Sequence, residues 1–425
     1  MDSHQSLSHQ TIPRIPKPGH TQKNVYEPVQ PDERIHEMDI VRGVALFGIL
    51  LANMAFFSSP VIYMQMAGVD WWTTPSDQIA EWFIQFFAEA KFFTMFSFLF
   101  GLGFAIFIQR AEKKGDKAVS LYLRRMFILL VIGLIHALLI RAGDILVMYA
   151  LLGFLLLFFR RSQPKKVLRW AFGLLIVPLL LFCLLLAGAL AAEPVLTDEQ
   201  LTVYHGLIEQ SLTAYGEGTY AQIFEQRWND FILMFQNFFV SGPQVLAMFL
   251  FGLYVGKRGM FAHLPEHTPF IRKVCFWSLI LGLPLVILQV VSSQLMGPDI
   301  SVYDITYYAG TTLGGPAFCF FYITSILLLS RKQTWRKLFS SLQAVGRTAL
   351  SNYLFQSIVC TTVFYSYGLG WYGQIGPAVW VLLAGIIFAI QIVLSNIWLQ
   401  RFRFGPLEWV WRTLTYGSKP MMRRQ

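Results

Sequence analysis

The sequence predicts an all-α protein that crosses a membrane about ten times, with both termini in the cytoplasm. Composition is the first reason: 55% of the 425 residues are hydrophobic and 14% are charged, whereas soluble domains carry about 25% charged residues. The second reason is that the basic residues lie in short clusters between long apolar runs, as topology signals do. For the same reason the net charge of +10 does not indicate nucleic-acid binding.

Ten apolar segments are long enough to cross the hydrocarbon core of a bilayer. They cover residues 39–58, 82–109, 122–141, 144–160, 168–192, 230–256, 272–295, 305–329, 347–366 and 376–399. The fourth is short, and Ser241-Gly242-Pro243 interrupts the sixth. Loops rich in Lys and Arg alternate with loops that carry mostly acidic and aromatic residues. This alternation obeys the positive-inside rule and orients every segment.

The remaining regions are polar. Residues 1–33 predict a disordered cytoplasmic tail without a cleavable signal sequence, ahead of a transmembrane domain over 34–400. The loop 193–229 is expected outside the membrane, with a short surface helix. Residues 401–425 begin with alternating basic and aromatic residues and end in a basic tail, which predicts an interfacial amphipathic helix on the inner leaflet.

The first apolar segment carries polar residues at its cytoplasmic edge and also deep in the membrane. Asp39 and Arg42 lie at the cytoplasmic edge, three residues apart on one helical face, so they can interact. Asn53 follows about 16 Å further along the helix axis, at about 1.5 Å per residue. A single Asn in a membrane helix usually forms a hydrogen bond with a neighbouring helix. The alternative is that Asn53 belongs to a functional site.

Ionisable residues inside a membrane segment are expensive and indicate function by default. Glu89 and Lys91 lie in the second segment. One interpretation is that each side chain pairs with another helix or extends to the outer interface. The other is that the two residues line a functional site. His136 lies in the outer half of the third segment, at a depth similar to Asn53 and close to that of Lys91. These three residues are therefore expected to line one cavity, with His136 as the candidate general base. A structural histidine is the alternative.

Two further sets of polar residues are candidates. Arg141 and Asp144 close the short hairpin between the third and fourth segments, where an ion pair would hold the turn. In the ninth segment, Asn352 and Gln356 share one helical face. Arg347 is expected at the cytoplasmic start of that helix, where a basic residue favours phosphate binding. The alternative is a topology charge followed by interhelical hydrogen bonds.

The backbone and the cysteines add two expectations. Gly310, Gly314, Gly315 and Pro316 interrupt the eighth segment, and irregular backbone at membrane depth is tolerated where it is buried in protein or lines a wet cavity. Each of the four cysteines falls inside an apolar run, so neither a disulfide framework nor a metal site is expected.

Five stretches resemble the YeiB-like family of bacterial multi-span membrane proteins, a family without a settled activity. They read RIHEMDIVRGVALFGILLAN, FFTMFSFLFGLGFA, GLIHALLIRAGDILVMYALLG, GRTALSNYLFQS and FGPLEWVWR, and together they extend over roughly residues 34–418. The resemblance implies a multi-pass protein of the bacterial plasma membrane.

That family is in turn remotely similar to the transmembrane acyltransferases that include the lysosomal heparan-α-glucosaminide N-acetyltransferase. Asp39, Arg42, Gly43 and Asn53 match their pattern of D..RG followed by a helix and an Asn. The likeness implies acyl-CoA bound from the cytoplasm and an acyl group passed to an acceptor on the other face. Those enzymes carry an essential His near this Asn, whereas residues 54–81 contain none, so only His136 is available for that role.

Three functions follow as hypotheses. In an acyltransferase, Arg42 and Arg347 would bind the phosphates of acyl-CoA, His136 would deprotonate the acceptor, and Asn53 would stabilise the oxyanion. The acceptor would be a small molecule, a glycan or a lipid, and no metal would be needed. A transporter for a small metabolite is the second hypothesis, because solute sites lie at interrupted helices. A non-catalytic scaffold is the third. The bilayer is the expected environment and a homodimer is possible in each case.

Overall fold

The computed structural model describes residues 35–115, 117–191, 197–261, 264–297 and 299–424. The predicted tail over residues 1–33 lies outside this range. The fold is all-α, and within the described residues the one isolated pairing of extended backbone joins Phe402 to Arg423. The helices are α1 (His36–Ser58), α2 (Val61–Ala67), α3 (Pro75–Phe87), α4 (Lys91–Lys114), α5 (Ala118–Leu139), α6 (Ile145–Phe159), α7 (Pro164–Ala191), α8 (Asp198–Gly216), α9 (Tyr220–Gln236), α10 (Phe238–Lys257), α11 (Thr268–Leu295), α12 (Val302–Ala309), the π-helical segment η2 (Gly310–Gly314), α13 (Gly315–Leu329), the short 3-10 segment η3 (Gln333–Trp335), α14 (Arg336–Arg347), α15 (Ala349–Phe364), α16 (Pro377–Arg401) and α17 (Pro406–Tyr416).

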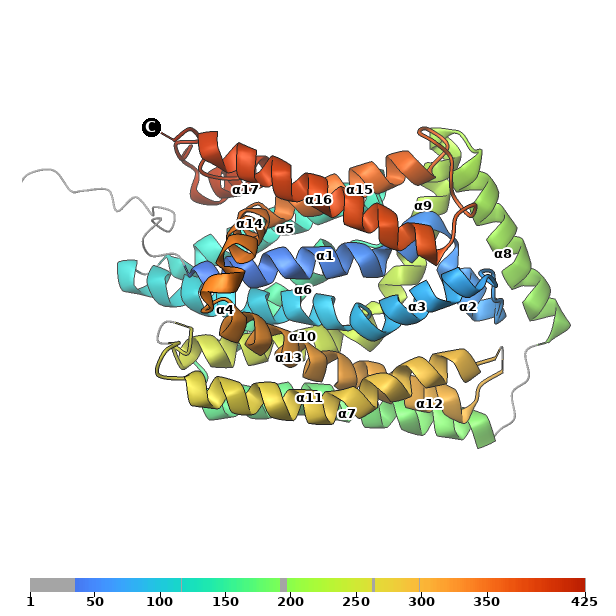
Figure 1. Ribbon diagram of the computed structural model, residues 1–425, viewed down its shortest axis with the longest axis horizontal. Coiled ribbons are helices and arrows are strands. Elements are labelled where there is room, and N and C mark those ends of the chain that lie inside the picture. Colours follow the sequence, from blue (N-terminus) through green and yellow to red (C-terminus); the bar gives the residue numbers. More distant parts are fainter. Residues whose placement is uncertain (1–34, 116, 192–196, 262–263, 298, 425) are drawn as a thin grey trace, which may run out of the picture.

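The protein is a multi-pass membrane protein. Among the described residues, eight helical stretches are long and apolar enough to cross a bilayer. The shorter helices α6, with 15 residues, and α15, with 16, occupy the predicted fourth and ninth segments. The long helices run side by side along the horizontal axis of Figure 1. The left-hand end, here called the basic end, holds the loops rich in Lys and Arg together with α14 and α17; α2, α8 and α9 lie at the opposite end.

Burial separates an interior from a lipid-facing wall. In the most apolar part of α1 and of α10, 61% of residues are buried, compared with 11% in α7 and 17% in α11. Figure 1 shows α7 and α11 together along one side of the bundle, with α1, α4 and α10 between them and α16. Their leucine-rich exposed surfaces suit contact with lipid, because apolar side chains cost nothing there.

Small residues bring the interior helices into backbone contact. A Cβ on Gly101 of α4 would lie 1.8 Å from the carbonyl oxygen of Phe249 on α10, and a Cβ on Gly252 of α10 would lie 1.9 Å from that of Phe98. The α1–α14 crossing repeats this arrangement, since a Cβ on Gly346 would lie 1.8 Å from the Asp39 carbonyl oxygen. Such close crossings maximise van der Waals contact where lipid removes the hydrophobic driving force.

The structure corrects four predicted boundaries. The second segment breaks between α3 and α4, where Ala90 takes a left-handed conformation with φ 63°. The sixth breaks at Asn237, before α10, rather than at Ser241-Gly242-Pro243, which lie inside that helix. The loop 193–229 holds α8 and most of α9 instead of one short helix. The ninth apolar segment begins with α15, because Arg347 is the last residue of the amphipathic helix α14.

Candidate functional site

A buried histidine and carboxylate meet where α5 turns into α6. His136 lies near the end of α5, and the short turn 140–144 brings Asp144 back over it. The His136 Nδ1 and Asp144 Oδ1 atoms are 3.0 Å apart, and both side chains are inaccessible to solvent. The contact departs from linear hydrogen-bond geometry, and the Nε2 atom has no hydrogen-bond partner among the described residues.

Asp144 is fixed by its other contacts. Its Oδ2 atom accepts a hydrogen bond from the Val147 amide at 3.1 Å, so the carboxylate caps the N-terminus of α6. Its Oδ1 atom accepts a hydrogen bond from the Tyr353 hydroxyl at 3.3 Å. Asp144 therefore lies against the imidazole, and α6 and α15 hold Asp144 in place. The predicted Arg141–Asp144 ion pair is wrong, because Asp144 pairs with His136 and Arg141 has other partners.

Arg141 joins the same turn to α1. Its Nη1 atom donates to the Gly143 carbonyl at 3.0 Å, and its Nη2 atom donates to the Asn53 Oδ1 atom at 3.4 Å. The guanidinium stacks on Phe57, 4.1 Å from the ring centroid. Its Nε atom is buried without a hydrogen-bond partner in the described part of the chain. Asn53, His136, Arg141, Asp144 and Tyr353 thus form one group, here called the turn cluster.

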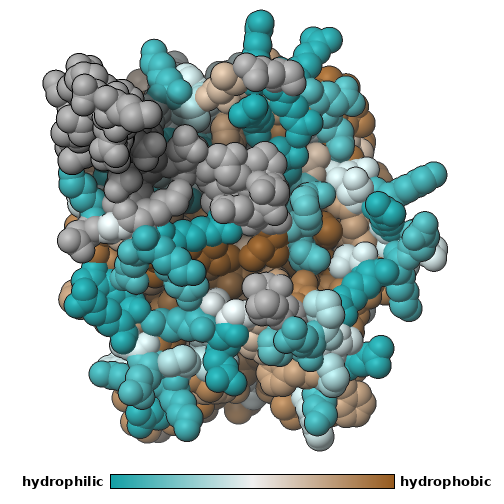
Figure 2. Space-filling model, turned by 90° about the vertical axis from the view of Figure 1, so that its left-hand side faces the viewer, coloured by the Kyte–Doolittle hydropathy of each residue, from teal (hydrophilic) through white to brown (hydrophobic). Residues whose placement is uncertain are grey.

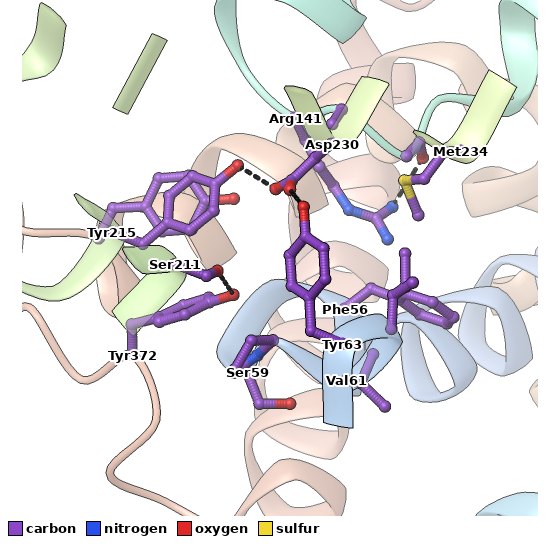
Figure 3. A pocket seen from close by; sticks show the side chains of 15 residues that line it. Phe56, Ser59, Val61, Tyr63, Arg141, Ser211, Tyr215, Asp230, Met234 and Tyr372 are labelled. Carbon is purple, nitrogen blue, oxygen red and sulfur yellow. Dashed lines mark hydrogen bonds between the residues drawn. The ribbon is translucent and has the colours of Figure 1, made fainter. Parts of the chain in front are cut away.

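A small recess opens next to the turn cluster at the end opposite the basic end. Figure 3 shows Arg141 beside it and the side chains of α2, α8 and α9 around it. Its lining includes Phe56, Ser59, Tyr63, Arg141, Gly143, Ser211, Tyr215, Asp230, Met234, Tyr365 and Tyr372. Hydroxyls, aromatic rings and one guanidinium around a concave space are typical of a small-molecule site.

Asp230 is the carboxylate of this recess, and its oxygens are occupied. The hydroxyls of Tyr63 and Tyr215 each donate to it at 2.6 Å (Figure 3), and Gln226 donates at 2.9 Å. Burial raises the pKa of Asp230, although these three hydrogen bonds and the charge of Arg227 oppose that rise. Burial, together with the Asp230 charge, also raises the pKa of Tyr63, which stays a neutral donor.

Lys91 and Glu89 belong to a separate group at the α3–α4 break. The fully buried Lys91 ammonium donates to the Gln85 carbonyl at 2.7 Å and to Gln289 on α11 at 3.1 Å. Glu89 accepts a hydrogen bond from the Tyr307 hydroxyl on α12 at 2.5 Å. The cavity expected from Asn53, His136 and Lys91 is therefore wrong for Lys91, since its contacts are with α3 and α11 and none joins the turn cluster.

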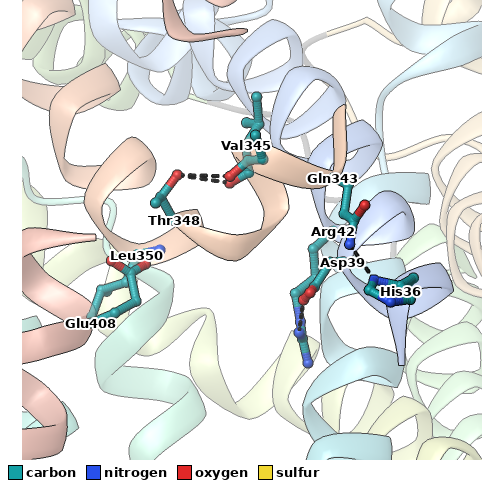
Figure 4. A network of polar contacts seen from close by, with 9 residues as sticks. His36, Asp39, Arg42, Gln343, Val345, Thr348, Leu350 and Glu408 are labelled. Atoms are coloured by element: carbon teal, nitrogen blue, oxygen red, sulfur yellow. Dashed lines mark hydrogen bonds and ion pairs between the residues drawn. The ribbon is translucent and has the colours of Figure 1, made fainter. Parts of the chain in front are cut away.

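At the basic end, Asp39 and Arg42 form the expected contact. Arg42 Nη1 lies 2.9 Å from Asp39 Oδ1, and the Asp39 side chain is buried beneath α14 (Figure 4). Arg125, which the sequence did not single out, lies on α5 and stacks on Phe107 and Trp411, with the Trp411 ring centroid 4.1 Å away.

Arg347 does not occupy the start of a helix. It ends α14, and its Nη2 atom donates to the Arg403 carbonyl at 3.3 Å. The N-terminus of α15 is instead occupied by a protein carboxylate, because Glu408 of α17 accepts hydrogen bonds from the Leu350 amide at 2.7 Å and the Ser351 amide at 3.2 Å (Figure 4). The predicted phosphate position at this helix start is therefore wrong.

Asn352 and Gln356 tie α15 to α16. Asn352 donates to Ser395 at 2.9 Å, and Gln356 donates to Gln391 at 2.9 Å. Gln391 in turn donates to the Asn352 carbonyl at 2.9 Å. These contacts agree with the interhelical interpretation of both residues. In the described part of the chain, no three His, Cys, Asp or Glu residues gather closely enough to hold a metal ion.

Several functional candidates carry no local sequence signal. Tyr353, Asp230 and Arg227 are brought to this end of the molecule by α15 and α9, far from His136 in the chain. Arg227 is fully buried, and among the described residues only its Nη1 atom has a hydrogen-bond partner, the Leu138 carbonyl at 3.0 Å. A charged residue in the predicted loop 193–229 gave no reason to expect burial.

Comparison with known proteins identifies the family. The chain is 38% identical to the uncharacterized protein YxaH of Bacillus subtilis (strain 168), over 92% of this chain and 96% of YxaH. It is 30% identical to an uncharacterized 39.9 kDa protein in the amylase 3' region of Bacillus acidopullulyticus, over 92% and 97% of the two chains. It is 27% identical to the uncharacterized protein YeiB of Escherichia coli (strain K12), over 90% and 96%.

A family model described as a protein of unknown function, DUF418, matches residues 255–418. This region contains α11 to α17 and therefore Tyr353, Asn352, Gln356 and Glu408. The relatives extend the similarity over at least 90% of the chain and confirm the expected likeness to YeiB. The chain belongs to the DUF418 family of membrane proteins of unknown function.

Proposed function

We propose that this protein is a membrane-embedded acyltransferase whose general base is His136. The observation that carries the proposal is the buried His136–Asp144 contact, with Nδ1 3.0 Å from the carboxylate and Nε2 without a partner in the described chain. A carboxylate on one imidazole nitrogen fixes the tautomer and leaves the other nitrogen to accept a proton. A histidine with a purely structural role would be expected to use both nitrogens.

The reaction would proceed by direct transfer. Nε2 of His136 would take the proton of an acceptor hydroxyl or amine as that atom attacks the thioester carbonyl of acyl-CoA. The C–S bond then breaks, and the departing thiolate takes the proton back from His136. Arg141 holds the oxygen of the Asn53 amide. The amide nitrogen therefore remains as a donor for the oxyanion that forms during attack.

The donor would enter from the basic end, on the cytoplasmic side of a bacterial plasma membrane. Arg42 on α1 is retained as a phosphate ligand, and Arg125 replaces Arg347, whose guanidinium is directed to the Arg403 carbonyl. Figure 2 shows the basic end, where hydrophilic side chains surround an apolar centre. A long, thin thioester arm would have to cover about 16 Å from Arg42 to Asn53 along α1, at about 1.5 Å per residue.

The test is transfer of radiolabelled acetyl groups from acetyl-CoA by proteoliposomes that contain membrane-extract acceptors. We expect His136→Ala to reduce transfer by about 100-fold or more, because general base catalysis contributes about 10²–10⁴-fold. Asp144→Asn should lower the rate and shift its pH profile, since Asp144 acts through His136. His205→Ala is the matched control, because His205 is exposed on α8. Full transfer by folded His136→Ala protein would refute the assigned role.

A specific observation also favours a transporter. The α3–α4 break touches the end of the π-helical segment: a Cβ on Gly315 would lie 2.8 Å from the Ala90 carbonyl oxygen. The buried Lys91 lies directly beside this point. Two irregular backbone segments and a buried cation are typical of a solute site in a transporter. Solute uptake that Lys91→Met abolishes and His136→Ala leaves intact would favour this function over acyl transfer.

A further inference from the structure

Arg141 is a buried cation without an ion-pair partner in the described part of the chain. Its side chain is 3% exposed, and no carboxylate oxygen of the described residues forms an ion pair with it. Its two terminal nitrogens have neutral partners, and its Nε atom has none. Stacking on Phe57 occupies the face of the guanidinium, whereas the Nε hydrogen lies in its plane and still requires an acceptor. A buried cation left in this state is costly.

The neighbouring acidic groups do not neutralise it by contact. Asp230 lines the same recess, but Tyr63, Tyr215 and Gln226 occupy its oxygens. Asp144 is engaged by His136 and by the N-terminus of α6.

A second buried cation adds to the positive field. Arg227 does not line the recess, but its charge acts on Tyr365, which does, together with the charge of Arg141 and the opposing charge of Asp230. Two of the three guanidinium nitrogens of Arg227 have no hydrogen-bond partner in the described chain. Two buried guanidinium groups near the recess thus keep donors without acceptors among the described residues, at the end of the protein that the positive-inside rule leaves poor in basic residues.

We infer that the recess binds a phosphate-bearing polyol, with the phosphate at Arg141 and the polyol against the tyrosine and serine side chains. Guanidinium groups are suited to phosphate because their planar donors match its oxygens. Ser59, Ser211 and Tyr372 provide hydroxyls on the wall, and Phe56 and Tyr365 provide aromatic surface. The wall thus offers one guanidinium and several hydroxyls within a small recess, which suits a small ligand such as a glycerophosphate group.

The inference rests on the proposed acyltransferase for one point only, that this polyol would be the acyl acceptor. Arg141 is shared between the recess and the turn cluster, and its hydrogen bond to Asn53 brings the two together. A hydroxyl of a ligand held at Arg141 would therefore lie close to the turn that follows His136, although His136 itself does not line the recess. Binding itself requires no acyl donor and can be measured separately.

Two sources offer this chemistry, a soluble glycerol phosphate and the headgroup of phosphatidylglycerol. The experiment uses full-length protein purified in a neutral detergent. Calorimetry measures binding of sn-glycerol 3-phosphate, inorganic phosphate and, as the uncharged control, glycerol. Native mass spectrometry compares retention of phosphatidylglycerol with that of phosphatidylcholine. Retention of phosphatidylglycerol without binding of glycerol 3-phosphate would identify the lipid as the source, and the reverse result would identify the soluble ester.

We expect Arg141→Gln to weaken binding at least about tenfold, because it removes a charge-assisted contact. Arg141→Lys, which keeps the charge and loses the planar donors, should fall between that variant and the wild type. Arg161→Gln is the control, since Arg161 is exposed at the basic end. If the Arg141 variants do not fold, Met234→Trp fills the recess, leaves the arginine in place and should also abolish binding.

The outcomes separate the two proposals. Equal affinity in wild type and folded Arg141→Gln protein, unchanged affinity in Met234→Trp, or no binding of any phosphate probe would overturn the inference. Arg141-dependent binding without any acyl transfer would support the recess and refute the acyltransferase. Acyl transfer to uncharged acceptors alone would support the acyltransferase and refute phosphate binding in the recess.

Discussion

Asp230 is a single residue whose ionisation the fold opposes. Its folded pKa lies above the ordinary value of 3.8, chiefly because of burial. The folded state therefore holds the proton more tightly than the unfolded state does. The associated stability is present below about pH 4 and is lost as the pH rises through the higher folded pKa.

The matching prediction concerns Asp230→Asn, which cannot ionise. As the pH rises from about 4 toward 7, the free energy of unfolding of the variant should increase relative to that of the wild type. Thermal unfolding of detergent-purified protein at several pH values measures this difference. Glu209→Gln, an exposed change on α8, is the control and should show no such trend. A difference that moves toward the wild type with rising pH would contradict the assigned pKa direction.

The residues of the turn cluster show what single positions can predict. Asn53, His136, Arg141 and Asp144 were each identified as polar groups inside or beside apolar segments. Their partners were not, because the conformation of a five-residue turn decides whether Asp144 reaches Arg141 or His136. Tyr353 and Asp230 contribute through α15 and α9, and contacts over such sequence separations leave no local pattern.

At the scale of helices, the glycines of the α4–α10 crossing lie where the facing backbone leaves no room for a side chain. Gly101→Ala should lower the free energy of unfolding by about 1–3 kcal/mol, because its Cβ would meet a backbone carbonyl that cannot rotate away. Gly173→Ala on α7 is the matched control. It meets nothing within 4 Å, and alanine there should be neutral or slightly stabilising. Urea or thermal unfolding of both variants tests the difference. An equal effect at the two sites would show that the crossing is not tightly packed.

A second prediction at the scale of helices concerns the cap that Glu408 provides for α15. Glu408→Ala removes the acceptor of two backbone amides at the start of α15 and should destabilise the protein by about 1–2 kcal/mol. Hydrogen exchange at residues 349–353 should accelerate more than exchange in α10. Leu414→Ala, an exposed change on the same helix, should leave both rates unchanged. Protection at α15 that survives Glu408→Ala would mean that the cap contributes little.

The sequence predicted most elements correctly because long apolar runs bounded by charged loops leave few alternatives. It did not predict the breaks at Ala88–Ala90 and Asn237. Neither break has a Gly or Pro at the break itself, and mostly apolar or aromatic residues flank both. At these points tertiary contacts, such as that between Ala90 and Gly315, override local helix propensity.

For the whole molecule, the prediction is orientation. In a variant with the four native cysteines replaced, Glu209→Cys on α8 should react with a membrane-impermeant maleimide in intact protoplasts. Lys165→Cys at the basic end should react only after permeabilisation. The reason is that Lys- and Arg-rich loops are retained in the cytoplasm. Labelling of Lys165→Cys in intact protoplasts would invert the topology and place the recess on the cytoplasmic side.

The contact between α17 and α15 has a consequence for the order in which the chain matures during synthesis. Glu408 follows every apolar segment in the sequence, yet it completes the start of α15, whose Tyr353 contacts Asp144. His136 and Asp144 leave the ribosome long before Glu408 does, because synthesis runs from the N-terminus. The His136–Asp144 turn therefore forms first, and the α15 side of the turn cluster gains its helix cap later, when α17 docks.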